Sequence, residues 1–405
     1  MSLAKNVEFL RRLPKVNKIT GFGDFGRNLT QNLRSPLVET TGFGSNPGGI
    51  RMFSFVPGNL QQPPALVVVL HGCGQTAAGY DLGAGWSTLA KHFGFALLMP
   101  EQQSANNPNT CFNWFNPEDT ARDSGEALSI RQMIARMAGD VGVDPHRIFI
   151  TGLSAGGAMT SMMLATYPEI FAAGAVIAGL PFGVATNVRE ALSGMFQAPN
   201  RPAGELGDLV RNASAHQGPW PKVSVWHGSA DRTVNPGNAN EIVKQWLDVH
   251  QLPAAPMSEA DVDGYPRQVW WNADGETIVE SYTITDMAHG TPVGVADNDE
   301  RYGAQGAFLI EAGISSSYHI ANFFGLTEWI RQPKQDLKEA SKEASKEAVK
   351  TIPPAASVPV PDLTTMLWPL ALPSCQAEPP LEPRRRAIDV SAVITRALTA
   401  AGLMK

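Results

Sequence analysis

The sequence predicts an α/β fold built on a mainly parallel β-sheet with helices on both faces. Short apolar runs rich in branched residues recur along the chain, at 65–70, 95–99, 147–151, 174–178 and 223–226. Continuous apolar runs of this length are typical of strands that are buried on both faces. Helix-forming segments lie between these runs, and such an alternation of strand and helix indicates a parallel sheet covered by helices.

The remaining segments of this region predict further helices and strands. Within 123–139, one apolar stripe at i, i+3, i+4 and i+7 is formed by Ile130, Met133, Ile134 and Met137. A further helix is expected over 238–249, and a further strand over 50–55. The runs 269–271 and 278–284 predict a hairpin near the sheet edge, because a turn sequence joins them.

Composition excludes several classes of function. Hydrophobic residues make up 43% of the 405 residues, which is ample for a globular core. The formal net charge of -6 argues against nucleic acid as a partner, since phosphate binding requires a basic face. No run approaches the roughly 20 apolar residues that span a bilayer. The N-terminus lacks the apolar stretch of a signal peptide, which favours a cytoplasmic location.

We expect one large α/β domain flanked by an arm and an appendage, at 45–332, 1–44 and 333–405. The appendage begins with a near-repeat of Lys, Glu and Ala that has no apolar face, which predicts a helical spacer. A proline-rich linker follows, because proline cannot continue a helix. The chain ends in a short amphipathic tail at 389–403.

The motif Gly152-Leu-Ser-Ala-Gly156 carries the chemistry of this sequence. A predicted strand at 147–151 precedes it and a helix-forming run at 158–167 follows it. This strand–turn–helix setting is that of a nucleophile elbow, and it predicts the α/β-hydrolase fold with Ser154 as nucleophile. The alternative is a plain Gly/Ser-rich turn that closes a βα unit without catalysis.

A serine hydroxyl needs a base to become a nucleophile, and the base needs an orienting acid. In this fold the acid and then the histidine follow the serine along the chain. Asp231 follows a predicted strand, at the sheet edge where such folds place their sites, although it could simply cap a turn. His289 is the favoured base because it follows a strand and lies beside a glycine. Its rivals, which have packing or surface interpretations, are His227, His250 and His319.

Ester hydrolysis by a serine also needs two backbone donors for the oxyanion. We expect one to be the N–H of Ala155, directly after the nucleophile. The other should come from the loop 71–75, where Gly72 and Gly74 let the backbone of Cys73 approach a substrate. A plain tight turn would explain the same glycines.

Together these residues resemble the esterase family of the poly(3-hydroxybutyrate) depolymerases that act on short-chain polyhydroxyalkanoates. Feruloyl and acetyl-xylan esterases are close cousins of that family. The resemblance covers roughly residues 45–330. The matching positions are His71-Gly-Cys-Gly74, Cys111-Phe-Asn-Trp-Phe115, Asp123, Gly152-Leu-Ser-Ala-Gly-Gly-Ala158, His227-Gly-Ser-Ala-Asp231 and His289-Gly290.

The resemblance implies a serine ester hydrolase with the triad Ser154, Asp231 and His289, acting on short 3-hydroxyalkanoate esters or oligomers. It also implies a disulfide between Cys73 and Cys111, which favours an extracellular location as the alternative to the cytoplasm. Two reduced thiols remain the alternative to that bridge. Neither a metal nor an organic cofactor is expected, because the triad performs both proton transfer and attack.

The residues expected to bind substrate are His71, Trp114 and Phe115. The two aromatic rings could form an apolar wall beside Ser154, or they could both belong to the core. Glycines crowd the backbone near the nucleophile and leave no obvious long acyl tunnel. We therefore expect esters of about two to four acyl carbons to be preferred.

Two further functions compete with this one. The chain could be a feruloyl or acetyl-xylan esterase, or a catalytically inactive protein that docks on polymer granules through its tail. The Ser/Asp/His set in its proper order argues against the inactive protein. The tail looks unlike a folded polymer-binding domain. The spacer and the proline-rich segment should pack little, so a chain ending near residue 332 should keep activity on soluble esters, and Cys375 should be unpaired.

Overall fold

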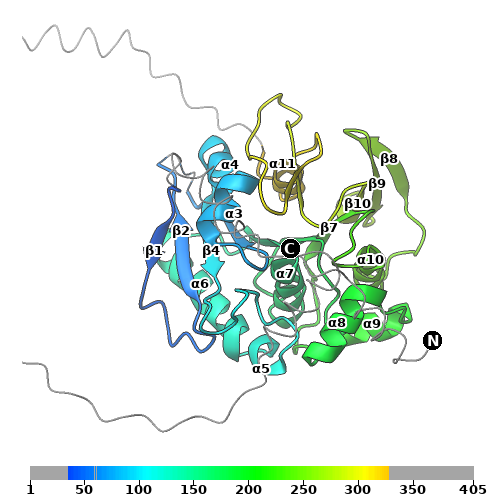
Figure 1. Cartoon of the computed structure of the whole chain (residues 1–405), viewed down its shortest axis with the longest axis horizontal. Helices are drawn as coiled ribbons and strands as arrows, with labels where there is room; N and C mark the ends of the chain where they lie inside the picture. Colours follow the sequence, from blue (N-terminus) through cyan, green and yellow to red (C-terminus); the bar gives the residue numbers. More distant parts are fainter. Residues whose placement is uncertain (1–34, 59, 61, 328–405) are drawn as a thin grey trace, which may run out of the picture. The chain divides into compact units, whose positions relative to one another are not determined.

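A ten-stranded sheet organises the part of the chain that the computed structural model describes, residues 35–58, 60 and 62–327 (Figure 1). The strands of this sheet are β1 (Val38–Thr40), β2 (Arg51–Phe55), β3 (Leu66–Leu70), β4 (Ala96–Glu101), β5 (Ile148–Leu153), β6 (Ala173–Ile177), β7 (Lys222–Gly228), β8 (Ser258–Val262), β9 (Tyr265–Trp271) and β10 (Thr277–Ile284). They lie side by side in the order β1-β2-β4-β3-β5-β6-β7-β10-β9-β8. The neighbours from β4 to β10 pair in parallel, and the pairs at both edges are antiparallel. The predicted mainly parallel sheet is confirmed.

Helices cover both faces of this sheet, as the sequence predicted (Figure 1). One face carries α6 (Gly125–Val141), α7 (Ala155–Thr166), α8 (Val188–Gln197), α9 (Ala203–Arg211) and α10 (Gly237–Val249). The other face carries α3 (Ala77–Ala84), α4 (Trp86–Phe93) and α11 (Ser316–Phe323). A short helix, α5 (Pro117–Thr120), precedes α6, and a separate parallel pair is formed by β11 (Thr291–Val293) and β12 (Leu309–Glu311).

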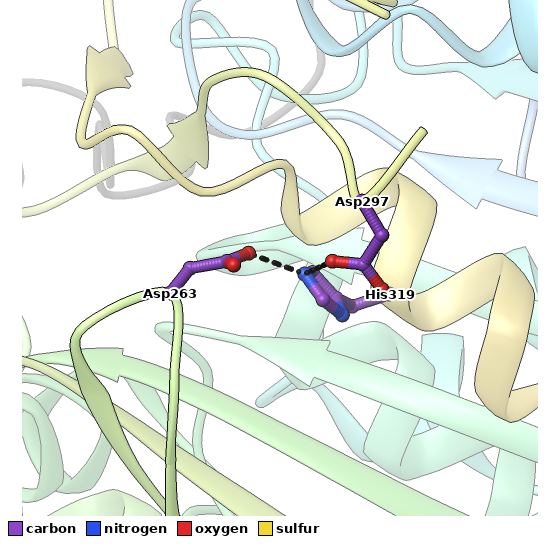
Figure 2. Close-up of side chains that lie close together, drawn as sticks. All are labelled: Asp263, Asp297 and His319. Carbon is purple, nitrogen blue, oxygen red and sulfur yellow. Dashed lines mark hydrogen bonds and ion pairs between the residues drawn. The ribbon is translucent and has the colours of Figure 1, made fainter. Parts of the chain in front are cut away.

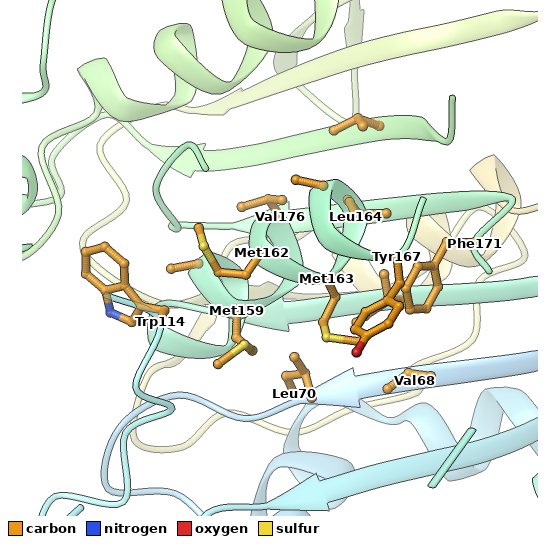
Figure 3. Packing of buried hydrophobic residues seen from close by; sticks show 14 of the residues in the cluster. Val68, Leu70, Trp114, Met159, Met162, Met163, Leu164, Tyr167, Phe171 and Val176 are labelled. Atoms are coloured by element: carbon orange, nitrogen blue, oxygen red, sulfur yellow. The ribbon is translucent and has the colours of Figure 1, made fainter. Parts of the chain in front are cut away.

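Strand β3 shows why the apolar runs become central strands. Every residue of its sequence Leu-Val-Val-Val-Leu is fully buried. Val68 and Leu70 face the helix α7, whose Met159 and Met163 lie close to them (Figure 3). Val67 and Val69 belong to the core on the opposite face, with α3 and α4. Side chains alternate between the faces of a strand, so burial on both faces requires an unbroken apolar run.

The sheet extends beyond the boundaries that the sequence indicated. Strand β1 lies within the predicted N-terminal arm and pairs with β2, so the sheet begins before residue 45. Strand β8, Ser-Glu-Ala-Asp-Val, was not predicted because almost all of it is exposed at the sheet edge. An edge strand in water needs no apolar face, and its sequence therefore carries little periodicity.

The predicted spacer helix, the proline-rich linker, the amphipathic tail at 389–403 and Cys375 lie outside the described residues. Within the part that is described, none of the helices is long and apolar enough to cross a membrane.

Candidate active site

Ser154 lies in the sharp turn between β5 and α7. Its backbone has φ 57° and ψ -117°, a strained conformation for a residue with a side chain, and its N–H donates to Ile177 O at 2.9 Å. A Cβ on Gly152 would lie 2.4 Å from Gly156 O, and one on Gly156 would lie 2.4 Å from Leu70 O. The turn therefore requires glycine on both sides of the serine, as the motif predicted.

His289 contacts Ser154 and Asp231 from its two ring nitrogens. Its Nε2 lies 2.9 Å from Ser154 Oγ, and its Nδ1 lies 2.7 Å from Asp231 Oδ2. A carboxylate oxygen only accepts, so Nδ1–H donates to Asp231 and Nε2 accepts from the serine hydroxyl. His289 is 135 residues from Ser154 and 58 residues from Asp231 in the sequence, and folding brings the three side chains together. Their hydrogen bonds are those expected of a nucleophile, a base and an orienting acid.

The carboxylate of Asp231 is held by four hydrogen-bond donors. Oδ1 accepts from the N–H groups of Thr233 and Val234, and Oδ2 accepts from His289 and, at 3.1 Å, from His227 Nε2. Burial alone would raise the pKa of Asp231, but the hydrogen bonds from His227 and His289 outweigh it and hold the pKa below its usual range. The acid therefore stays ionised and keeps the imidazole oriented.

Adjacent parallel strands bring the acid and the histidine together. Asp231 follows β7 and His289 follows β10, and these two strands are paired. Their loops are joined by a hydrogen bond from Ala230 N–H to Met287 O at 3.0 Å. A Cβ on Gly228 would lie 2.2 Å from the same carbonyl, so this close approach requires glycine. The carboxyl edge of the sheet is where open α/β folds place their sites.

The three alternative histidines form hydrogen bonds with groups other than Ser154. His250 Nε2 bonds to Pro221 O at the end of α10. His319 lies on α11, with its Nε2 2.9 Å from Asp263 Oδ2 and 3.8 Å from Asp297 Oδ1 (Figure 2). One ligand-type atom from each residue of this second group lies within 4.8 Å of the others, so the three could hold a divalent cation. His227 supports Asp231, beside which the sequence placed it.

The two expected oxyanion donors lie on segments that are in contact. Ala155 is the first residue of α7, and Cys73 lies in the 71–75 loop after β3. The close approach of Gly156 to the carbonyls of Leu70 and His71 joins the two segments. Neither the Cys73 nor the Ala155 N–H donates to an acceptor within the described residues, so both are available to a substrate oxygen. The N-terminus of α7 adds its positive dipole end.

The predicted disulfide between Cys73 and Cys111 is present, with 4.3 Å between the two Cα atoms. It links the 71–75 loop to the 111–115 loop, 38 residues further along the chain. The position of Cys73 is therefore set by two segments and not by its own turn alone.

Comparison with known proteins settles the family. The sequence profile described as Esterase PHB depolymerase matches residues 52–259. This chain belongs to that family. It is 45% identical to the Poly(3-hydroxyalkanoate) depolymerase C of Paucimonas lemoignei over 291 residues, which cover 72% of this chain and 70% of the relative.

The esterase relatives named for plant polymers are also similar. The acetylxylan esterase of Coprinopsis cinerea is 35% identical over 263 residues, which cover 63% of this chain and 69% of the relative. The solved acetyl xylan esterase from Aspergillus awamori matches with a TM-score of 0.57 and 28% identity, over 62% of this chain and 93% of that one. These similarities show that the chain is an ester hydrolase with the α/β-hydrolase fold.

In this esterase His71 is not placed to bind substrate, which corrects the role expected from the sequence. The side chain is fully buried. Its Nδ1–H donates to Gly72 O at 2.8 Å, and its Nε2 accepts from Gln102 N–H at 3.1 Å. Burial lowers the pKa of His71 to about 4, so the ring is neutral and both nitrogens are already bonded. It stabilises the 71–75 loop instead.

For the two aromatic rings of the 111–115 loop, the sequence left a substrate wall and a core position both open. Trp114 and Phe115 are only 5% and 8% exposed, and Trp114 lies in the core beside α7 (Figure 3). Phe115 lines a cleft of about 380 Å³ together with asparagine side chains of the same region. Phe308, which the sequence did not single out, is 41% exposed, and its ring centroid lies 6.0 Å from that of His289. The exposed ring beside the histidine is therefore Phe308.

Two buried polar residues near the site were also missed. Gln102 and Glu126 are 2% and 0% exposed and are joined by a hydrogen bond. The sequence did hold a signal for Glu126, because it precedes Ile130, Met133 and Met137 by four, seven and eleven residues on the apolar stripe of α6. A carboxyl group on an apolar stripe indicates a buried polar contact.

Proposed function

We propose that this esterase hydrolyses short-chain esters through Ser154, His289 and Asp231, by way of an acyl-enzyme. The hydrogen-bonded row from Asp231 through His289 to Ser154 carries the proposal. His289 Nε2 takes the proton of Ser154 as its Oγ attacks the ester carbonyl, and Asp231 stabilises the imidazolium that forms.

The N–H groups of Cys73 and Ala155 stabilise the negative oxygen of the tetrahedral intermediate. Its collapse breaks the ester C–O bond, and the alcohol leaves with the proton from His289. Water then attacks the acyl-enzyme, with His289 taking its proton, and the acid and free Ser154 result. The low pKa of Asp231 supports this cycle, because the carboxylate remains ionised throughout.

For the substrate we propose short 3-hydroxyalkanoate esters or oligomers. The support is the 45% identity to a poly(3-hydroxyalkanoate) depolymerase, against 35% for the acetylxylan esterase of Coprinopsis cinerea. The second candidate is an acetyl or feruloyl ester of plant cell-wall material, favoured by the similarity to the solved acetyl xylan esterase.

A substrate panel separates the two candidates. kcat/KM is measured for 3-hydroxybutyrate oligomers, acetylated xylan, methyl ferulate and p-nitrophenyl esters of graded chain length. We expect the hydroxybutyrate oligomers to give the highest value among the natural-type substrates. Faster turnover of acetylated xylan or methyl ferulate would instead support the plant cell-wall candidate.

On p-nitrophenyl esters, kcat/KM should be highest for about two to four acyl carbons and should fall with each added methylene. The physical reason is that the glycines beside Ser154 let the backbone of Leu70 and His71 approach closely. We expect this close packing to leave little room for a long acyl chain. A maximum at ten or more carbons would contradict this prediction and indicate a lipase.

Phe308→Ala should lower kcat/KM on butyryl esters by about tenfold. The exposed ring beside His289 offers rigid apolar surface to an acyl or hydroxyacyl unit, and losing it removes about 1–2 kcal/mol of contact. Phe308→Leu, which keeps an apolar side chain, should lose less. Equal losses in the two variants, or none, would show that the ring does not contact the substrate.

A further inference from the structure

Glu126 is a fully buried carboxyl group in the first turn of α6, and the proposed mechanism gives it no part. Both of its oxygens accept hydrogen bonds. Oε1 accepts from the side-chain amides of Gln102 and Asn113, and Oε2 accepts from the N–H of Asn113 at 2.9 Å. Its three donors come from two residues, Gln102 and Asn113. Gln102 is hydrogen-bonded to His71 of the 71–75 loop, and Asn113 belongs to the 111–115 loop, which the disulfide joins to Cys73.

The first route runs through Gln102 and His71. The N–H of Gln102 donates to His71 Nε2 at 3.1 Å, which fixes the ring so that its Nδ1–H donates to Gly72 O. The Gly72 carbonyl and the Cys73 N–H belong to one planar peptide group and point in opposite directions. Holding the Gly72 carbonyl therefore fixes the direction of the Cys73 N–H.

The second route runs through the 111–115 loop and the disulfide. Gln102 Nε2 also donates to Cys111 O at 3.1 Å, and Glu126 binds Asn113 by both its N–H and its side chain. Cys111 is joined to Cys73 by the disulfide. The backbone and the side chain of Cys73 are thus both connected to Glu126.

We propose that Glu126 is a positioning residue for the oxyanion hole, because it joins the two routes that aim the Cys73 N–H at the substrate oxygen. The proposal rests on the proposed function, since it assigns a role within that same site. Burial, with the nearby Asp119 carboxylate adding to it, raises the pKa of Glu126 to about 8. A neutral carboxyl group avoids the cost of burying a charge and still accepts from both amides.

The variant Glu126→Gln tests this role with little change in volume. Its Oε1 can still accept two hydrogen bonds, but its NH2 group faces the N–H of Asn113, so that two donors meet and the 111–115 loop is displaced. We expect kcat on a p-nitrophenyl butyrate substrate to fall about tenfold with KM within about twofold, since the oxyanion forms only in the transition state. Glu126→Asp keeps two acceptor oxygens and should recover part of kcat.

Ser129→Ala is the matched control. Ser129 lies one turn further along α6, is fully buried, and accepts from Gly48 N–H while donating to Gly125 O, and neither partner belongs to the 71–75 or the 111–115 loop. Its loss should lower the melting temperature but leave kcat within about twofold. An unchanged kcat in Glu126→Gln, or an equal loss of kcat in Ser129→Ala, would overturn the proposal.

The rate of Ser154 labelling by a fluorophosphonate separates this proposal from the proposed function. A wild-type protein that neither labels nor turns over esters would overturn the proposed function itself. A wild-type protein that does both, with Glu126→Gln equal to it, would overturn only the role of Glu126. We expect slower labelling in Glu126→Gln, because phosphonylation also places a negative oxygen in the hole.

Discussion

Replacing Ser154 by alanine should reduce ester turnover by roughly three orders of magnitude or more, while the fold remains intact. The variant keeps the turn and loses only the hydroxyl that lies 2.9 Å from His289 Nε2. His289→Ala should lose nearly as much, because the serine then has no base and the leaving alcohol has no acid. kcat/KM on p-nitrophenyl butyrate and the melting temperature of each variant provide the measurement.

His319→Ala is the control for the base. Its imidazole is also buried and also bonded to a carboxylate, but it lies on α11, and the carboxylates near it are those of Asp263 and Asp297. We expect this variant to lose stability and to keep most of its activity per folded molecule. If His319→Ala lost activity while His289→Ala kept it, the base would be wrongly assigned.

Removing the disulfide should produce the largest loss of stability. The double variant Cys73→Ser, Cys111→Ser should lower the free energy of unfolding by about 3–4 kcal/mol, because the bridge closes a loop with a sequence separation of 38 residues and restricts the unfolded chain. Activity should fall as well, since Cys73 carries a proposed oxyanion donor and the bridge holds its loop. Denaturant unfolding and kcat are the two measurements.

Reduction of the wild-type protein should reproduce both effects, and Cys375→Ser should reproduce neither. A double variant with wild-type stability under oxidising conditions would show that the loops hold their positions without the bridge. Loss of stability with an unchanged kcat would limit the disulfide to a role in folding.

The sequence by itself determined the central strands of the sheet and the three proposed catalytic residues. Runs such as that of β3 predict buried strands because the side-chain period of a strand is two and both faces are apolar. Ser154 could be predicted because the flanking glycines are a local requirement of its turn. Asp231 and His289 followed from chain order, since the carboxyl ends of parallel strands meet at one edge.

Only the tertiary structure decided which side chains near the site are buried and which are exposed. His71, Trp114 and Phe115 lie in motifs that suggested substrate contact, yet all three side chains are less than a tenth exposed, although Phe115 lines a cleft. The exposed ring beside His289 is that of Phe308. The hydrogen-bonded link from Glu126 to Cys73 could not be predicted from the sequence either, because it passes through residues of three different segments. Local spacing can indicate that a position within a helix or a strand is buried, but it does not identify the distant residue that a buried polar group contacts.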